Sequence, residues 1–204
     1  MDYQSTLFEA PVADGLSLAG LTRRELGQGA WVDVARTWLP EADDVFATLA
    51  REVPWRAEKR QMYDRLVDVP RLVHTYMVDE PLPHPVLERA REALSDHYLP
   101  ELLERFRTAG CCYYRDGRDS VAWHGDTIGR GSTHDTMVAI VSVGDPRRLQ
   151  LRPRGGGESV SVEMGHGDLL VMGGSCQRTW EHAVPKVAAA GPRISVQFRP
   201  FGVF

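Results

Sequence analysis

Gly165-His166-Gly167-Asp168-Leu169-Leu170-Val171-Met172-Gly173-Gly174 is the stretch of this chain with the clearest fold signal. Glycines stand on both sides of an apolar run, and glycine is the usual residue where a tight turn needs a positive φ. A short apolar run between turn signals is typical of a fully buried strand. The segment therefore predicts a tight turn, a buried strand and a second tight turn.

The same pattern extends through the C-terminal half of the chain. Short segments with strand character are separated by turn signals such as Asp116-Gly117 and Gly155-Gly156-Gly157. Many short strands with regularly spaced turns are typical of a β-sandwich or barrel. We expect strands at residues 110–114, 121–124, 136–143, 147–152, 158–163, 168–172 and 193–199.

The N-terminal half has a different, partly helical pattern. Alternation predicts a strand at residues 31–35 and short strands at 61–63 and 72–76. Helices are predicted over residues 40–51, which begin with acidic side chains, and over residues 85–98. Helices followed by strands favour an α+β fold, here a double-stranded β-helix (jelly roll) with N-terminal helices packed on one face.

Composition and charge limit the class of protein. The chain has 204 residues and a formal net charge of −4, so any contact with nucleic acid must come from a local patch. Its three cysteines cannot all pair, which indicates a reducing compartment. No apolar run approaches the roughly 20 residues that cross a bilayer, and the start lacks a signal-peptide pattern. We expect a cytoplasmic monomer without membrane contact.

His124 and Asp126 form an H-x-D pair in the segment Trp123-His124-Gly125-Asp126-Thr127. On a strand, residues i and i+2 point to the same face, so both side chains can chelate one ion. The pair alone is weak evidence, because a surface histidine near an aspartate is common. His182, where a later strand ends, supplies a second imidazole, whereas His166 between two glycines is interpreted as a turn residue. Two imidazoles and one carboxylate are the facial ligand set of non-haem Fe(II) oxygenases.

The strand predicted from Arg193 to Arg199 has an arginine at each end, on the same face. Two arginines facing into a barrel are costly unless they meet anions. A dicarboxylate would supply them, because a guanidinium binds a carboxylate through two parallel hydrogen bonds. The alternative is that both arginines face solvent while Ile194, Val196 and Phe198 are buried. The strand alone leaves both arrangements open, and the neighbouring metal-ligand candidates favour the anion.

Six motifs occur in an order that is far more specific than any one of them. They are Tyr114-Arg115-Asp116-Gly117-Arg118-Asp119, His124-x-Asp126, Ile140-Val141-Ser142-Val143-Gly144, the segment from His166 to Gly174, His182, and Arg193-x-Ser195-x-Gln197-Phe198-Arg199. In this order they resemble the AlkB-like Fe(II)/2-oxoglutarate dioxygenases, which oxidatively dealkylate nucleic acids. The resemblance covers roughly residues 30–200.

The resemblance implies Fe(II) at the three ligand candidates and 2-oxoglutarate as co-substrate. It implies that Arg193 pairs with the distal carboxylate of 2-oxoglutarate, helped by Tyr114, and that Arg199 lies beside the iron-proximal end.

Three positions depart from the family pattern. Cys112 stands where the family usually has Asn, and Ser195 and Gln197 stand where it usually has Asn and Thr or Ser. We therefore include Cys112 and Ser195 among the candidate co-substrate contacts. Residues 127–129 lack the acidic residue that many nucleic-acid repair members carry after the H-x-D pair.

The resemblance also implies alkylated DNA or RNA as the partner, with the target base in a single strand or flipped from a duplex. Val69-Pro70-Arg71 and the later Tyr76 resemble the substrate-side segment of part of the family. Tyr76 and Tyr63 are predicted to stack on the base, although ordinary packing explains both tyrosines equally well.

Arg154 is a further substrate-contact candidate, because it belongs to the densest basic cluster of the chain. Phosphate contact is one interpretation of this cluster, and a solvated strand edge is the other. Its members are Arg147, Arg148, Arg152 and Arg154.

We expect residues 1–30 to be an N-terminal extension and residues 31–204 to be a single dioxygenase domain. Within it, residues 31–109 would form the substrate-side segment and supporting helices, and residues 110–204 the jelly-roll core. The implied activity is oxidative dealkylation of N-alkylated bases, with release of succinate, CO2 and an aldehyde. Two alternatives stay open: a 2-oxoglutarate-dependent hydroxylase of a small molecule or protein, and a jelly-roll metal-binding module without catalysis.

Overall fold

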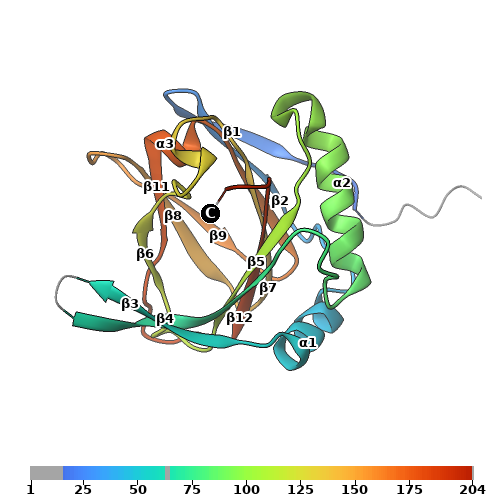
Figure 1. The fold of residues 1–204 in the computed structure, drawn as a ribbon, viewed down its shortest axis with the longest axis vertical. Coiled ribbons are helices and arrows are strands. Elements are labelled where there is room, and N and C mark those ends of the chain that lie inside the picture. The colour runs from blue at the N-terminus through green and yellow to red at the C-terminus, as the bar shows by residue number, and fades with distance from the viewer. Residues whose placement is uncertain (1–15, 63–64, 204) are drawn as a thin grey trace, which may run out of the picture.

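The computed structural model describes residues 16–62 and 65–203, which form a mostly β protein (Figure 1). The helices are α1 (Ala42–Glu52), α2 (Pro85–Leu102) and the short α3 (Cys176–Thr179). The strands are β1 (Thr22–Gly27), β2 (Ala30–Ala35), β3 (Arg56–Met62), β4 (Arg65–Tyr76), β5 (Thr108–Tyr114), β6 (Val121–His124), β7 (Val138–Gly144), β8 (Arg147–Pro153), β9 (Val160–Met164), β10 (Asp168–Gly174), β11 (Trp180–Val184) and β12 (Arg193–Arg199).

The strands form two antiparallel sheets, an arrangement consistent with a jelly roll. The eight-stranded sheet has the order β1-β2-β10-β7-β12-β5-β4-β3, and the four-stranded sheet has the order β6-β11-β8-β9. In Figure 1 the two sheets face each other, and both long helices run along the outer side of the larger sheet. Among the described residues, no helix is long and apolar enough to cross a membrane.

Strand β10 confirms the prediction of a buried strand between two tight turns. It pairs with β2 on one side and β7 on the other. Leu169 and Val171 belong to one hydrophobic core, and Leu170 and Met172 belong to a second. The strand is apolar throughout because each face of the sheet covers its own core. Gly173 leaves room for Trp31, since a Cβ there would lie 2.1 Å from the indole ring.

The two cores lie on opposite faces of the eight-stranded sheet. The first contains Val45 and Leu49 of α1 and Val86 and Leu94 of α2, together with inward residues of the sheet such as Phe198. The second joins residues of the eight-stranded sheet to β8 and β11 of the smaller sheet. The space between the two sheets is therefore the interior that surrounds the candidate site.

The structure corrects the sequence prediction in three places. Residues 22–27 were expected in an extension but form edge strand β1, which is polar and is recognisable only by its pairing with β2. Arg23 strengthens that pairing through two 2.8 Å bonds to the Asp33 carboxylate. The two short strands expected between residues 61 and 76 are the ends of the longer β3–β4 hairpin. Helix α3 was not predicted, because four residues are too few to show a helical period.

Candidate metal centre

The three ligand candidates come together on the interior face of the smaller sheet. His124 ends β6 and lies directly opposite His182 of β11, with 4.2 Å between the ring centroids. Asp126 follows two residues later, and its Oδ1 is 3.7 Å from His124 Nε2. The potential ligand atoms of all three residues lie within 4.8 Å of one another. Asp126 and His182 are buried, whereas the side chain of His124 is 39 % exposed.

The protonation state of the cluster suits a divalent cation. The His124 Nδ1 is 2.9 Å from the Ala122 carbonyl oxygen, so Nδ1 carries the proton and Nε2 is left as the ligand atom. Burial lowers the pKa of His124, and burial lowers the pKa of His182 to about 3. Burial alone would raise the pKa of Asp126, but the charge of Arg199 and the two imidazoles outweigh it and lower this pKa to about 2. The cluster thus offers two neutral imidazoles and one carboxylate at neutral pH.

Two contacts hold Asp126 in place. Arg199 Nε donates to Asp126 Oδ2 at 2.7 Å, which leaves Oδ1 toward the imidazoles. The Asp126 backbone N–H donates to Gln177 Oε1 at 2.9 Å. Sequence patterns missed Gln177, because it lies on α3 and carries no motif of its own.

Gly125 lies between two ligands and is closely packed. A Cβ at this position would lie 2.5 Å from Arg154 Nη2 and 2.7 Å from the Gln177 carbonyl oxygen. Any side chain would push the Asp126 loop away from α3 and β8. Glycine is therefore needed here for close packing beside the ligands.

Arg193 occupies the same interior, on strand β12. It is 2 % exposed, and its Nε donates to Ser142 Oγ at 2.8 Å. Its Cζ lies 5.1 Å from the centre of the Tyr114 ring, which is opposite in the β5–β12 register. Among the described residues, its Nη1 has no hydrogen-bond partner, and no carboxylate forms an ion pair with it. Burial lowers the pKa of this guanidinium, so an anion at Nη1 would relieve an unfavourable charge.

The outward alternative for Arg193 and Arg199 is wrong, because both faces of β12 are buried. Ile194, Val196 and Phe198 pack into the core beneath the helices, while the arginines face the interior between the sheets. The orphaned guanidinium and the neutral histidine pair together fit a metal with a carboxylate co-substrate.

A row of polar side chains connects Arg193 with Arg199 along the interior face. Gln197 Nε2 donates to Ser195 Oγ at 2.6 Å, and Gln197 Oε1 lies 3.8 Å from Cys112 Sγ. Cys112 and Ser195 are directly opposite in the β5–β12 register. The residues that depart from the family pattern therefore contact one another between the two arginines.

The family model described as the 2OG-Fe(II) oxygenase superfamily matches residues 74–199. The chain belongs to this superfamily. Its cofactors are accordingly Fe(II) and 2-oxoglutarate, and the resemblance to AlkB-like dioxygenases is confirmed.

Curated relatives carry AlkB names. The chain is 34 % identical over 185 residues to alpha-ketoglutarate-dependent dioxygenase alkB homolog 3 of Bos taurus, covering 79 % of this chain and 62 % of that protein. It is 32 % identical to the Homo sapiens protein of the same name, covering 90 % and 68 %. It is 29 % identical to DNA oxidative demethylase ALKBH2 of Mus musculus, covering 78 % and 74 %.

Two solved structures share the fold of this oxygenase. "The structure of OsALKBH1" aligns with a TM-score of 0.57 at 14 % identity, covering 87 % of this chain and 100 % of that one. A 2OG-Fe(II) oxygenase family oxidoreductase from Burkholderia pseudomallei aligns with a TM-score of 0.54 at 17 % identity, covering 78 % of each chain. At these identities the likeness concerns the fold alone.

Two of the predicted substrate residues lie near the metal candidates of this oxygenase. Arg71 Nε donates to Cys112 Sγ at 3.4 Å, on the interior face of β4. Arg154 Nη2 donates to the Gln177 carbonyl oxygen at 3.4 Å and lies against Gly125. Arg71 therefore borders the interior, and Arg154, which is exposed, lies beside the segment that carries His124 and Asp126.

Tyr76, one of the two tyrosines predicted to stack on a base, lies away from Arg71 and Arg154. Tyr76 pairs with Ala109 and packs against the core beneath the helices, 4.6 Å from the His74 ring. It lies on the opposite face of β4 from Arg71, because the two are an odd number of residues apart. The stacking prediction for Tyr76 is therefore wrong. Tyr63 lies outside the described residues.

The basic cluster predicted on β8 is divided between the two faces of its sheet. Arg147 is buried, and it donates to the carbonyl oxygens of Asp119 at 2.8 Å and Pro185 at 2.6 Å. Arg152 faces outward and pairs with Glu181 at 3.0 Å. Strand alternation therefore separates Arg147 from the predicted cluster, whereas Arg154 lies 4.0 Å from Glu181, the same residue that Arg152 pairs with.

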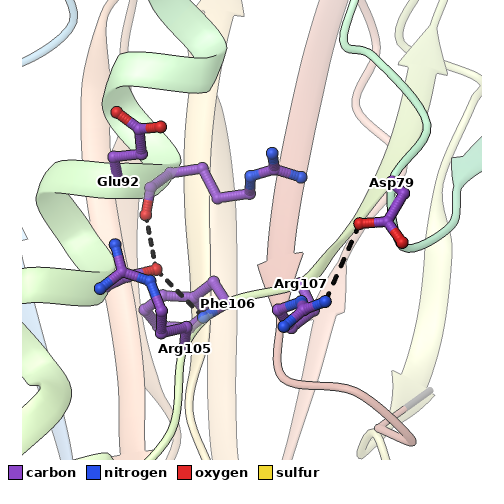
Figure 2. Close-up of a pocket in the computed structure, with 7 residues that line it drawn as sticks. Asp79, Glu92, Arg105, Phe106 and Arg107 are labelled. Atoms are coloured by element: carbon purple, nitrogen blue, oxygen red, sulfur yellow. Dashed lines mark hydrogen bonds and ion pairs between the residues drawn. The ribbon is translucent and has the colours of Figure 1, made fainter.

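A surface cavity of about 200 Å³ lies apart from the ligand candidates (Figure 2). Two of its arginines already have carboxylate partners within the chain: Arg107 lies 3.9 Å from Asp79, and Arg105 lies 2.7 Å from Asp96. Ser95 Oγ accepts the Phe106 N–H at 3.1 Å at its wall. Unlike the interior around Arg193, this cavity has no orphaned buried polar atom among its described lining residues.

Proposed function

We propose that this chain is an Fe(II)- and 2-oxoglutarate-dependent oxygenase that removes alkyl groups from base nitrogens in DNA or RNA. The observation that carries the proposal is the cluster of His124, Asp126 and His182, whose ligand atoms lie within 4.8 Å of one another. The names of its relatives support the substrate class, since they include alkB homolog 3 and a DNA oxidative demethylase. The chain spans only 62 % of the Bos taurus relative, so we base the proposed activity on the residues of this chain's own site.

We propose that His124, Asp126 and His182 are the Fe(II) ligands. When bound, Fe(II) with 2-oxoglutarate and dioxygen supplies the oxidation that hydroxylates the alkyl carbon, after which succinate, CO2 and an aldehyde are released. Burial keeps both imidazoles unprotonated and available as ligands. Arg199 holds Asp126 ionised and fixes one of its two oxygens.

Arg193 and Tyr114 are the proposed anchor for the distal carboxylate of 2-oxoglutarate. Arg193 has a buried Nη1 without a described partner, which is the donor that such a carboxylate would accept from. Burial raises the pKa of Tyr114 to about 12, so its hydroxyl stays protonated and can also donate. Cys112 and Ser195 lie between this anchor and Arg199, where they would contact the same co-substrate.

Arg71 and Arg154 are the proposed substrate contacts. Arg71 borders the interior and Arg154 lies beside Gly125, and both carry positive charge that a phosphate or a base edge can meet. The target base must leave the stack to reach a site inside the molecule, so single-stranded or base-flipped substrate is expected. The formal net charge of −4 limits the attraction to such local contacts.

The finer fold proposal is a double-stranded β-helix within one domain, with α1 and α2 on its outer face. The core that these helices share with the eight-stranded sheet supports it. The domain boundary would then lie before β1 rather than at residue 31.

The test is a turnover screen that measures succinate release. Fe(II), 2-oxoglutarate and oligonucleotides carrying N1-methyladenine or N3-methylcytosine are compared with unmodified oligonucleotides and with free amino acids. We expect release to rise with the methylated strands and the methyl group to leave as formaldehyde. Turnover that responds to amino acids or other small molecules, and not to methylated strands, would contradict the nucleic-acid assignment.

A further inference from the structure

Gln177 is buried at 1 % exposure, and its side chain is directed at the backbone of a ligand candidate. Its Oε1 accepts the N–H of Asp126 at 2.9 Å, and its Nε2 lies 3.8 Å from Met172 Sδ on β10. The β6–β11 pairing runs only from Val121 to His124, so the Asp126 N–H has no ladder partner in that sheet. Gln177 supplies the missing acceptor.

The support behind Gln177 is well anchored. It lies on α3, and Ser175 at the start of that helix donates its hydroxyl to the Gln28 carbonyl oxygen at 2.6 Å. The Ser175 backbone N–H donates to Gly29 at 3.1 Å. Helix α3 is thereby tied to the β1–β2 turn of the larger sheet. The contact between Gln177 and Asp126 therefore transmits the position of the larger sheet to the loop that follows β6.

We infer that Gln177 is a positioning residue for Asp126. Arg199 fixes the carboxylate of Asp126, and Gln177 fixes its backbone, so the two together set where Oδ1 points. Without the amide acceptor, the Asp126 N–H would be buried without a partner and the loop would shift to find one. The inference rests on the proposed metal site, because it assigns Gln177 a role through Asp126.

The test compares two variants that each remove one buried side-chain acceptor of a backbone N–H. Gln177→Met keeps the length of the side chain and an apolar contact with Met172. The matched control is Ser95→Ala on α2. This variant removes the buried hydroxyl that accepts the hydrogen bond of the Phe106 N–H. For each protein, the Kd for Mn(II) is measured by EPR, and Tm is measured with and without Mn(II).

We expect Gln177→Met to raise the Mn(II) Kd by about 10- to 100-fold, the range typical of residues that orient metal ligands. Its Mn(II)-induced rise in Tm should shrink accordingly. Ser95→Ala should lower the Tm of the metal-free protein and leave the Mn(II) Kd unchanged. If Gln177→Met lowers Tm but binds Mn(II) as the wild type does, Gln177 only packs the core and the inference is overturned.

A third variant, Asp126→Asn, distinguishes a wrong role for Gln177 from a wrong assignment of the metal site. If the wild type binds Mn(II) and Asp126→Asn does not, the site stands whatever Gln177→Met does. If the wild type fails to bind Mn(II), or Asp126→Asn binds it equally well, the proposed function is overturned, and the role of Gln177 with it.

Discussion

The two ends of the interior between the sheets differ in charge balance. At the metal end, Asp126 is paired with Arg199, and burial keeps both histidines neutral. At the other end, Arg193 is buried, and it has no ion-pair partner among the described carboxylates. The first end therefore has its carboxylate and imidazoles arranged for a cation, whereas at the second end the positive charge of Arg193 has no carboxylate beside it among the described residues. Under the proposed function, a dicarboxylate such as 2-oxoglutarate would supply the charge that the second end lacks and an additional ligand for the metal at the first.

Arg147 is a second buried arginine near the Arg193 end of the interior. Its guanidinium is also buried, and it donates to backbone carbonyl oxygens and lies near the ring of Tyr114, 5.5 Å from its Cζ. Arg193 approaches the same ring at 5.1 Å. Two buried guanidinium groups near one tyrosine make this end strongly positive, and a buried positive charge is costly until it is paired.

Removing a metal ligand should have the largest effect. His182→Ala leaves one imidazole and one carboxylate, so we expect loss of Mn(II) binding well beyond the roughly 10- to 100-fold typical of residues behind the ligands. Turnover should be lost with it. His134→Ala, at an exposed histidine of the chain, is the matched control and should behave as the wild type. Retained metal affinity in His182→Ala would show that His182 is not a metal ligand.

Breaking the ion pair at the metal end should destabilise the metal-free protein. Arg199→Met leaves the Asp126 carboxylate buried without its cation, which typically costs about 3–5 kcal/mol of unfolding free energy. Bound Mn(II) should restore part of that loss, because it supplies positive charge beside the same carboxylate. Urea unfolding with and without Mn(II) measures both effects.

Arg178→Met is the control for that experiment. Arg178 also pairs with a carboxylate, that of Asp135, but both side chains are more exposed than those of Arg199 and Asp126. Its loss should cost no more than about 1 kcal/mol. Equal losses in the two variants would mean that burial at Asp126 has no energetic consequence.

Removing the Arg193 guanidinium, which lacks an ion-pair partner among the described carboxylates, should weaken co-substrate binding without a loss of stability. We expect Arg193→Met to weaken 2-oxoglutarate binding by about 10- to 100-fold, because hydrogen bonds to charged groups contribute about 1.5–3 kcal/mol. The metal-free protein should be no less stable than the wild type, because a buried charge without an ion pair is replaced by an apolar group. Calorimetric titration and urea unfolding test the two halves. A large loss of stability in metal-free Arg193→Met would show that this charge is already compensated within the chain.

The smallest effect is expected outside the interior. Arg152→Ala removes a half-exposed ion pair with Glu181, so the free energy of unfolding should change by no more than about 1 kcal/mol. Oligonucleotide affinity should be unchanged, whereas Arg154→Ala, beside Gly125, should weaken it. Equal weakening by both variants in a fluorescence-anisotropy assay would show that Arg152 and Arg154 both contact the oligonucleotide, as the predicted phosphate-binding cluster requires.

The sequence predicted most of the strands, and the structure brings its three candidate metal ligands together, because both depend on local periodicity and order along the chain. The apolar run at residues 169–172 and the H-x-D spacing of His124 and Asp126 carry that information directly. The orientation of Arg193 could not be read from its strand, because both faces of β12 are buried and alternation gives no sign of which is which.

The wrong or missing predictions concern residues whose surroundings depend on the pairing of strands or on a very short helix. Tyr76 was assigned to the wrong face, because the face depends on the β4–β5 register and on where the helices pack. Arg147 was grouped with surface arginines, although its partners are carbonyl oxygens far along the chain. Gln177 was missed because its role depends on a contact with Asp126, 51 residues away, from a helix too short to predict.

We propose that one co-substrate joins the two ends of the interior. The most direct test is calorimetric titration of 2-oxoglutarate into the wild type, His182→Ala and Arg193→Met, each with and without Mn(II). We predict that Mn(II) tightens binding in the wild type and in Arg193→Met but not in His182→Ala, and that Arg193→Met weakens binding whether or not Mn(II) is present. A wild-type affinity for 2-oxoglutarate that is the same with and without Mn(II) would contradict the claim.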